Sequence, residues 1–243
     1  MNHLLSKIGS YPFEKLNLLH KDIKPSKEVI NLSIGEPKLN ADSKVLDILN
    51  KETNSFSNYP PMNAVPELSE AYRQYLKSHF GIGNVAEDEV CLVAGTREGT
   101  FSIIQALFNK ENVKEKPYVV MPNPFYQIYG GATTLAGGEA KFLDCPEEDN
   151  FQPDLDSLKS EDWQKCQILV LCSPNNPTGS ILPLSKLKDI LDLAEKYDFY
   201  VVSDECYVDL YTSEKSCPSI LQASLDRSDR LIALHSLSKR SNL

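Results

Sequence analysis

The sequence alternates between short apolar runs and longer stretches with helical spacing, and this alternation is the strongest constraint on the fold. Apolar residues recur with helical spacing over residues 100–108 and 184–197. Around these stretches lie runs rich in aliphatic residues, at 89–93, 118–121, 140–143, 168–172, 200–203 and 231–234. Continuous apolar strands separated by helices are typical of a mostly parallel sheet that is covered on both faces. The predicted fold class is therefore α/β, with three layers.

The first fifty residues do not follow this alternation. They contain a short amphipathic stretch at residues 13–19 and a piece at residues 29–34 that is predicted to be extended. Helical spacing then begins at residues 64–80. We therefore predict two parts, an N-terminal arm or small-domain segment over residues 1–50 and a large domain over residues 51–243.

Composition excludes several classes of function. The chain has 243 residues and a formal net charge of -9, and its basic residues are dispersed among acids, which argues against nucleic-acid binding. No apolar run approaches the roughly 18 residues that a membrane helix needs, and the N-terminus lacks the apolar core of a secretory signal. The six cysteines form no CxxC pair, so a zinc site is not expected and a reducing cytoplasm fits best.

Residues with polar or aromatic side chains follow the predicted strands, where ligands bind in sheets of this kind. Residues 94–99 open a helix with Gly95 and Thr96, whose backbone N–H groups could bind a phosphate or simply cap the helix. After the next strand, Tyr126 lies in a proline-rich turn, where its ring could stack on a flat cofactor or pack in the core.

Three later segments are more specific. Two X–Pro bonds within residues 173–177 predict a rigid loop that can contain cis bonds and that holds the Asn176 amide in place. Asp204 directly follows the run at 200–203. Burying a carboxylate there costs free energy unless it meets a cation, such as a protonated pyridine nitrogen, or a hydrogen-bond donor. Lys239 follows the last run, close to two serines, and carries an amine that can capture a carbonyl. A lone lysine near a serine is otherwise a typical surface residue.

The order of these segments resembles the fold-type I, class I and II aminotransferases, which depend on pyridoxal 5'-phosphate. The NNPTG segment at 175–179, DECY at 204–207 and SLSK at 236–239 carry the resemblance best. More narrowly, YPFEKL at 11–16, SIGEPK at 33–38, GTRE at 95–98, NPFYQIY at 123–129 and HSLSKRSNL at 235–243 look like the bacterial succinyldiaminopimelate transaminases of lysine and diaminopimelate synthesis. The resemblance covers essentially the whole chain and makes residues 51–243 the cofactor-binding domain.

The resemblance implies a role for each residue around the cofactor ring. Lys239 would hold pyridoxal phosphate through an imine and then carry a proton between the substrate α-carbon and the cofactor. Asp204 would pair with the pyridine N–H. Asn176 and Tyr207 would hydrogen-bond the phenolic oxygen of the ring, and Tyr126 would stack on its face.

Further residues would hold the phosphate and the substrate. The backbone N–H groups of Thr96 and Arg97 and the hydroxyl of Ser236 would bind the phosphate. Tyr59 matches a tyrosine that reaches the phosphate of the neighbouring subunit, which implies a homodimer. Gly35 matches a glycine whose backbone lies against the substrate carboxylate.

The resemblance also marks what the chain lacks. Family members continue past the lysine with a glycine-rich segment that carries a phosphate-binding arginine, and then with a small domain that carries a substrate-binding arginine. We therefore expect the large domain to be incomplete, cofactor retention to be weak and turnover to be low. Ala64 and residues 38–40 also depart from the usual pattern, which affects substrate detail more than cofactor chemistry.

The sequence leaves three functions open. The first is transamination between glutamate and an N-succinylated amino-keto acid, in the cytoplasm. The second is transamination of aspartate, alanine or aromatic amino acids, or a carbon–sulfur lyase reaction, with the same cofactor residues. The third is a non-catalytic fragment. Specificity cannot be read from the cofactor site alone.

Overall fold

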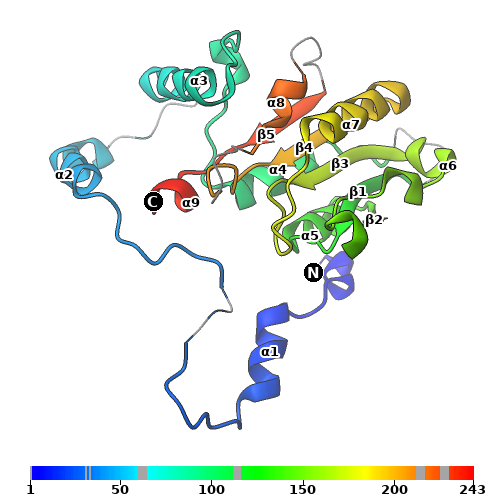
Figure 1. The fold of residues 1–243 in the computed structure, drawn as a ribbon, viewed down its shortest axis with the longest axis horizontal. Helices are drawn as coiled ribbons and strands as arrows, with labels where there is room; N and C mark the ends of the chain where they lie inside the picture. Colours follow the sequence, from blue (N-terminus) through cyan, green and yellow to red (C-terminus); the bar gives the residue numbers. More distant parts are fainter. Residues whose placement is uncertain are drawn as a thin grey trace.

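A parallel β-sheet forms the centre of the protein, as seen in the computed structural model (Figure 1). The structure describes residues 2–30, 32, 34–57, 59, 65–111, 116–211, 217–224 and 230–243. Within these residues the strands are β1 (Tyr118–Asn123), β2 (Glu139–Asp144), β3 (Cys166–Cys172), β4 (Tyr200–Asp204) and β5 (Leu231–Leu234). All neighbouring strands pair in parallel, in the order β2-β1-β3-β4-β5. The predicted α/β class and parallel sheet are confirmed.

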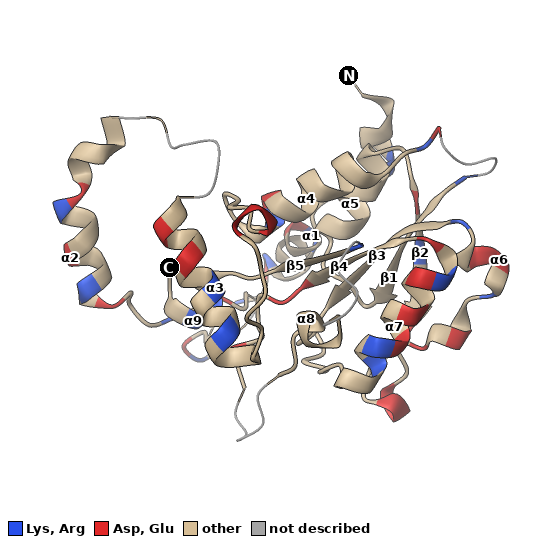
Figure 2. Ribbon diagram, turned by 90° about the horizontal axis from the view of Figure 1, so that it is seen from above, with Lys and Arg blue, Asp and Glu red and all other residues tan. Residues whose placement is uncertain are grey.

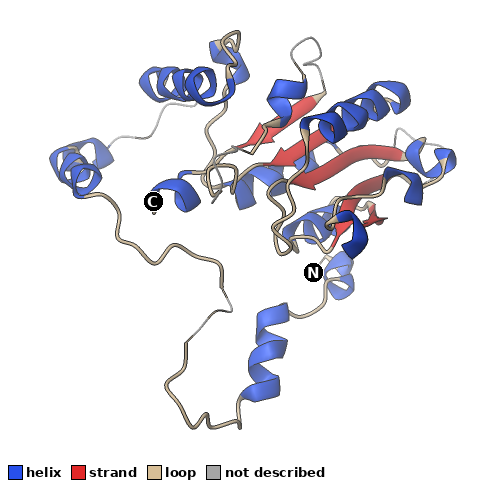
Figure 3. Ribbon diagram, viewed as in Figure 1, coloured by secondary structure: helices blue, strands red, loops and turns tan. Residues whose placement is uncertain are grey.

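Helices cover both faces of this sheet, which gives the predicted three layers (Figure 3). One face packs against α6 (Ser160–Trp163), α7 (Leu184–Tyr197) and α8 (Ile220–Ala223). The other face packs against α4 (Thr96–Leu107) and α5 (Ile128–Leu135). The described α-helices outside these layers are α1 (Pro12–His20), α2 (Ser43–Lys51), α3 (Pro66–Phe80) and α9 (Leu237–Ser241). Short 3-10 turns lie at His3–Lys7, Thr53–Ser57, Glu87–Glu89, Glu147–Asp149 and Leu155–Ser157.

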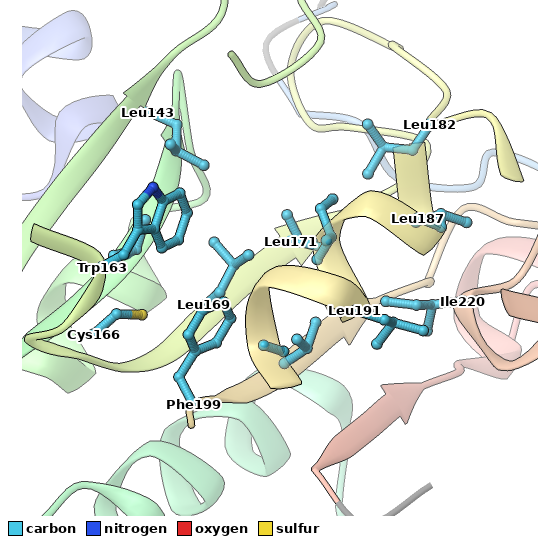
Figure 4. Packing of buried hydrophobic residues seen from close by; sticks show 14 of the residues in the cluster. Leu143, Trp163, Cys166, Leu169, Leu171, Leu182, Leu187, Leu191, Phe199 and Ile220 are labelled. Carbon is cyan, nitrogen blue, oxygen red and sulfur yellow. The ribbon is translucent and has the colours of Figure 1, made fainter. Parts of the chain in front are cut away.

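Alternate residues of a strand point to opposite faces of the sheet. Helices cover both faces here, so each apolar strand is buried on both sides. Leu169 and Leu171 of β3 belong to the cluster under α7, whereas Ile168 and Val170 belong to the cluster under α4 and α5. Figure 4 shows the first cluster, in which the Trp163 ring stacks near Phe199 and α7 contributes leucines. Burial on both faces explains why these strands are continuous apolar runs.

The prediction of a strand at residues 89–93 is wrong. Glu89 ends a 3-10 turn, and residues 90–95 have no regular structure. In the described part of the chain no strand pairs with this segment, and the side chains of Leu92 and Val93 are 42% and 45% exposed. A strand needs a neighbour for its backbone N–H and C=O groups, so an apolar run alone is not sufficient.

The N-terminal arm extends away from the sheet (Figure 1). Its amphipathic stretch lies in α1. The piece at 29–34 that is predicted to be extended forms no strand in its described residues, and Asn31 and Ser33 lie outside the described residues. Large apolar side chains of the arm are exposed, including Leu19 at 80% and Leu32 at 87%. The predicted helix at 64–80 is α3, and Ala64 lies outside the described residues. The division at residue 50 remains a prediction.

Charged residues of both signs are mixed on the outer surfaces of α2, α3 and α7 (Figure 2). A mixed surface of this kind is what dispersed lysines and acids predict. Of the helices that the structure describes, none has the length and apolarity to cross a membrane.

Candidate functional site

The N-terminus of α4 faces the carboxyl end of the sheet and presents free backbone donors. Gly95 precedes it with φ 105°, a backbone conformation that strains any residue with a Cβ, so the turn favours glycine. The first helical hydrogen bond is donated by Gly99 to the carbonyl of Gly95. The N–H groups of Thr96 and Arg97 therefore have no acceptor within the helix. They and the helix dipole can bind an anion, as the sequence predicts.

Tyr126 is held by a side chain from this same helix. Arg97 Nε donates a hydrogen bond of 2.9 Å to the Tyr126 hydroxyl, and this contact raises the pKa of Arg97. The Tyr126 ring meets the Tyr129 ring edge-on, with centroids 5.8 Å apart. The aromatic ring that is predicted to stack on a cofactor is therefore fixed at both its hydroxyl and one edge.

Asp204 ends β4 and its side chain is 6% exposed. Its Oδ2 accepts a hydrogen bond of 2.7 Å from the Tyr129 hydroxyl, and its Oδ1 accepts one of 3.3 Å from the backbone N–H of Cys206. Among the described residues no lysine, arginine or histidine lies within ion-pair distance of this carboxylate. A buried carboxylate without a cation is unfavourable, so this site fits a ligand that brings a positive charge.

Lys239 and Tyr207 lie together beyond the ends of β5 and β4. The Lys239 amine lies 5.8 Å from the centre of the Tyr207 ring and donates a hydrogen bond of 2.6 Å to the carbonyl of Gly35 in the arm. Burial and the neighbouring Cys172, Cys206 and Asp204 raise the pKa of Tyr207 to about 12. The hydroxyl of Tyr207 is therefore a hydrogen-bond donor at neutral pH.

The loop at 173–179 contains the predicted cis bonds, at Ser173–Pro174 and at Asn176–Pro177. The Asn176 side chain is partly exposed, and no hydrogen bond of its side-chain amide is formed within the part of the chain that the structure describes. The amide is therefore available to a ligand at the end of β3.

Besides Asn176, two predicted residues are not joined to this cluster. Ser236 caps α9, where its Oγ accepts from the N–H of Ser238 at 3.2 Å. Tyr59 is 99% exposed. The other predicted residues have contacts at the site: Thr96 Oγ1 lies 2.9 Å from Cys206 Sγ, Arg97 bonds Tyr126, and Asp204 bonds Tyr129. Lys239 contacts both Gly35 and Tyr207.

Glu205, His235 and Tyr72 form a series of polar contacts behind the cluster that the sequence did not predict. Glu205 is 2% exposed, and its Oε1 accepts from Ser203 Oγ at 3.0 Å and from the Ile220 N–H at 2.8 Å. Its Oε2 lies 3.0 Å from His235 Nε2, although the two are not aligned for a hydrogen bond. The Tyr72 hydroxyl lies 2.5 Å from His235 Nδ1. These contacts tie α3 to the ends of β4 and β5, next to Ser236 and Lys239.

The comparisons with known proteins agree with this arrangement. A family model described as aminotransferase class I and II matches residues 27–243. A solved aminotransferase from Neisseria meningitidis Z2491 is 40% identical with a TM-score of 0.93, and the match covers 100% of this chain and 63% of that chain. A probable N-succinyldiaminopimelate aminotransferase from Thermus thermophilus is 29% identical with a TM-score of 0.77, over 88% of this chain and 56% of that chain.

A curated relative extends the comparison to sequence. LL-diaminopimelate aminotransferase 2 from Nostoc sp. (strain PCC 7120 / SAG 25.82 / UTEX 2576) is 29% identical over 243 residues, which is 98% of this chain. The chain spans 61% of the length of that relative.

Proposed function

Because the chain belongs to the class I and II aminotransferases, a family whose members use pyridoxal phosphate, we propose that the protein transfers an amino group between glutamate and an N-succinylated amino-keto acid. The observation that carries the proposal is the buried Asp204 carboxylate, which has no cation among the described residues and lies at the same sheet edge as Lys239. We place this activity in the cytoplasm, since all six cysteines are free thiols.

Pyridoxal phosphate supplies a carbonyl that captures amines and a ring that accepts the electron pair left when a proton departs. Lys239 would hold the cofactor through its Nζ, and its amine is the group that would move the proton at the substrate α-carbon. Asp204 keeps the ring nitrogen protonated. Asn176 and Tyr207 donate hydrogen bonds to the phenolic oxygen, and Tyr126 packs on the ring face.

The remaining residues would bind the cofactor phosphate and the substrate carboxylate. The N–H groups of Thr96 and Arg97 and the hydroxyl of Ser236 bind the phosphate. The backbone of Gly35, which already contacts the Lys239 amine, lies against the substrate carboxylate. Residues 51–243 form the cofactor-binding domain, and residues 1–50 form the arm.

We propose N-succinyl-LL-2,6-diaminopimelate as the amino donor and 2-oxoglutarate as the acceptor, in diaminopimelate and lysine synthesis. The support is the similarity to the Thermus protein and the narrower motif resemblance. The Nostoc relative makes unsuccinylated LL-diaminopimelate a second candidate. The two substrates differ in charge at the distal amine, so a single assay distinguishes them.

The experiment measures amino transfer in single half-reactions. We expect glutamate and N-succinyl-LL-2,6-diaminopimelate to convert the cofactor to its amino form, and LL-diaminopimelate, aspartate and alanine to do so about a hundredfold more slowly. The same assay is run on a chain extended at its C-terminus with the corresponding segment of the Neisseria protein. Because precise orientation of a substrate changes rates about a hundredfold, we expect that extension to raise turnover by a similar factor.

Two results contradict these expectations. Faster conversion with LL-diaminopimelate or aspartate would assign a different substrate to the same cofactor site. An extended chain with no gain in turnover, despite a native circular-dichroism spectrum, would show that the substrate contacts lie elsewhere.

We further propose that the protein is a homodimer whose arms pack against the partner. Exposed apolar side chains along the arm, such as Leu19, Ile30 and Leu32 at 80–87% exposure, are unfavourable in water and suit an interface. Tyr59 is 99% exposed, as expected of a residue that completes the site of a partner. Sedimentation should give a dimer, and a variant without residues 1–40 should sediment as a monomer. A full chain that stays monomeric at all concentrations would contradict this proposal.

A further inference from the structure

Tyr129 carries the most deeply buried side chain of the candidate site. Its side chain is fully buried at 0% exposure, although it carries a hydroxyl that must find a partner. That partner is Asp204 Oδ2, at 2.7 Å. The two residues are 75 positions apart, on α5 and at the end of β4, so the contact is a product of the fold.

The tyrosine is held in place from several sides. Its ring meets Tyr126 edge-on, and the hydroxyl of Thr133 donates a hydrogen bond of 2.7 Å to its backbone carbonyl. The thiol of Cys172, at the end of β3, also lies beside its hydroxyl. The phenol therefore has one position, and that position fixes the carboxylate that it touches.

The direction of the hydrogen bond follows from the surroundings. Burial and the nearby carboxylate of Asp204 raise the pKa of Tyr129 well above its ordinary value. The phenol keeps its proton and donates it to Oδ2. Oδ1 accepts the longer bond from the Cys206 N–H, at 3.3 Å, and the Cys206 thiol also contacts the carboxylate. An ionised carboxylate has about four lone-pair sites, so it retains capacity for a further donor.

We propose that Tyr129 is a positioning residue for the cofactor ring: its phenol occupies Asp204 Oδ2 and orients the carboxylate so that Oδ1 receives the ring N–H. This inference rests on the proposed function, in which Asp204 holds that nitrogen. The resemblance to the family gave Tyr129 no role. Because Tyr129 lies on α5, the orientation of the Asp204 carboxylate would depend on the position of this helix.

A purely structural tyrosine would behave differently. A core hydroxyl that only satisfies a buried acid contributes to the free energy of unfolding and leaves the electronic state of a bound ring unchanged. A positioning residue also changes how strongly the ring nitrogen is held, which alters the pH at which the lysine-bound cofactor changes colour.

The test compares Tyr129→Phe with the wild-type chain loaded with pyridoxal phosphate. The variant keeps the ring and its packing and removes one hydroxyl. We expect cofactor affinity, measured from the visible absorbance band, to fall about tenfold, since a hydrogen bond to a charged group is lost. We also expect the pH midpoint of that band to move upward, because a less firmly paired ring nitrogen withdraws fewer electrons from the linkage to Lys239.

Thr134→Val is the matched control, since it removes a hydrogen bond in the same helix, from Thr134 Oγ1 to the Gly130 carbonyl at 2.9 Å, which involves neither Tyr129 nor Asp204. It should lower the thermal midpoint and leave the pH midpoint of the band unchanged. A Tyr129→Phe chain with the affinity and pH midpoint of the wild type overturns this inference alone. A shift of equal size in Thr134→Val also overturns it, because the effect would then come from packing of the helix. If the wild-type chain forms no band, the proposed function fails and this inference fails with it.

Discussion

Replacing Lys239 with alanine is expected to abolish the visible absorbance band that the chain develops with pyridoxal phosphate. The Lys239 amine is the amine that the structure places beside Tyr207 and at the same sheet edge as Asp204. The expected loss is nearly complete, because the band depends on a covalent bond that forms at the Lys239 amine, and surface amines react only weakly. Reduction with borohydride and peptide mapping by mass spectrometry should find the cofactor on Lys239 in the wild-type chain.

Lys188→Ala is the matched control for this prediction, since Lys188 is an exposed lysine on α7. That variant should retain the full band and the label on Lys239. Free pyridoxal phosphate reacts weakly with surface amines, so label that is spread over many lysines in the wild-type chain would contradict the assignment. Retention of the band in Lys239→Ala would contradict it directly.

Replacing Asp204 with asparagine is expected to weaken cofactor binding by about 30- to 4,000-fold. Removing one partner of a buried charge pair costs about 2–5 kcal/mol, and each 1.4 kcal/mol is a factor of ten. Asparagine keeps the size of the side chain and can still accept the Tyr129 hydroxyl, so the change isolates the charge. The measurement is a titration of the absorbance band with pyridoxal phosphate.

Glu205→Gln is the control for Asp204→Asn, because Glu205 is the adjacent buried acid and contacts Ser203 and His235 instead. It should lower the thermal midpoint while it leaves cofactor affinity close to that of the wild type. Equal loss of affinity in both variants would mean that any buried charge in this region is needed for folding, and the pairing of Asp204 with the ring would lose its support.

Much of the sheet could be predicted because each buried strand carries its own signal. The runs within β1, β3 and β4 are apolar at successive positions, and burial on both faces requires this. The segment at 89–93 has the same composition and is not a strand, since pairing depends on a neighbour that composition does not encode. Strand order likewise depends on contacts between distant segments, so the alternation gave no basis for predicting it.

In the candidate site, the sequence likewise predicted some features and not others. Asp204 and Lys239 could be predicted because they follow strands, and carboxyl ends of parallel strands share one edge. The side-chain contacts could not be predicted. Arg97 enters the prediction through its backbone, but in the structure its guanidinium holds Tyr126. Tyr129 is equally compatible with a core role on sequence alone, and only the folded chain brings its hydroxyl to Asp204.

The hydrogen bond between the Lys239 amine and the Gly35 carbonyl connects segments 204 residues apart. An amine that bonds covalently to a carbonyl ligand keeps at most one N–H of the three that it has as an ammonium, so capture of a ligand would compete with the hydrogen bond to Gly35. Two such events are thermodynamically linked, and each weakens the other by the same factor. The contact between the arm and Lys239 would therefore lower the affinity of this amine for a ligand, and a bound ligand would free the backbone of Gly35 to meet a substrate.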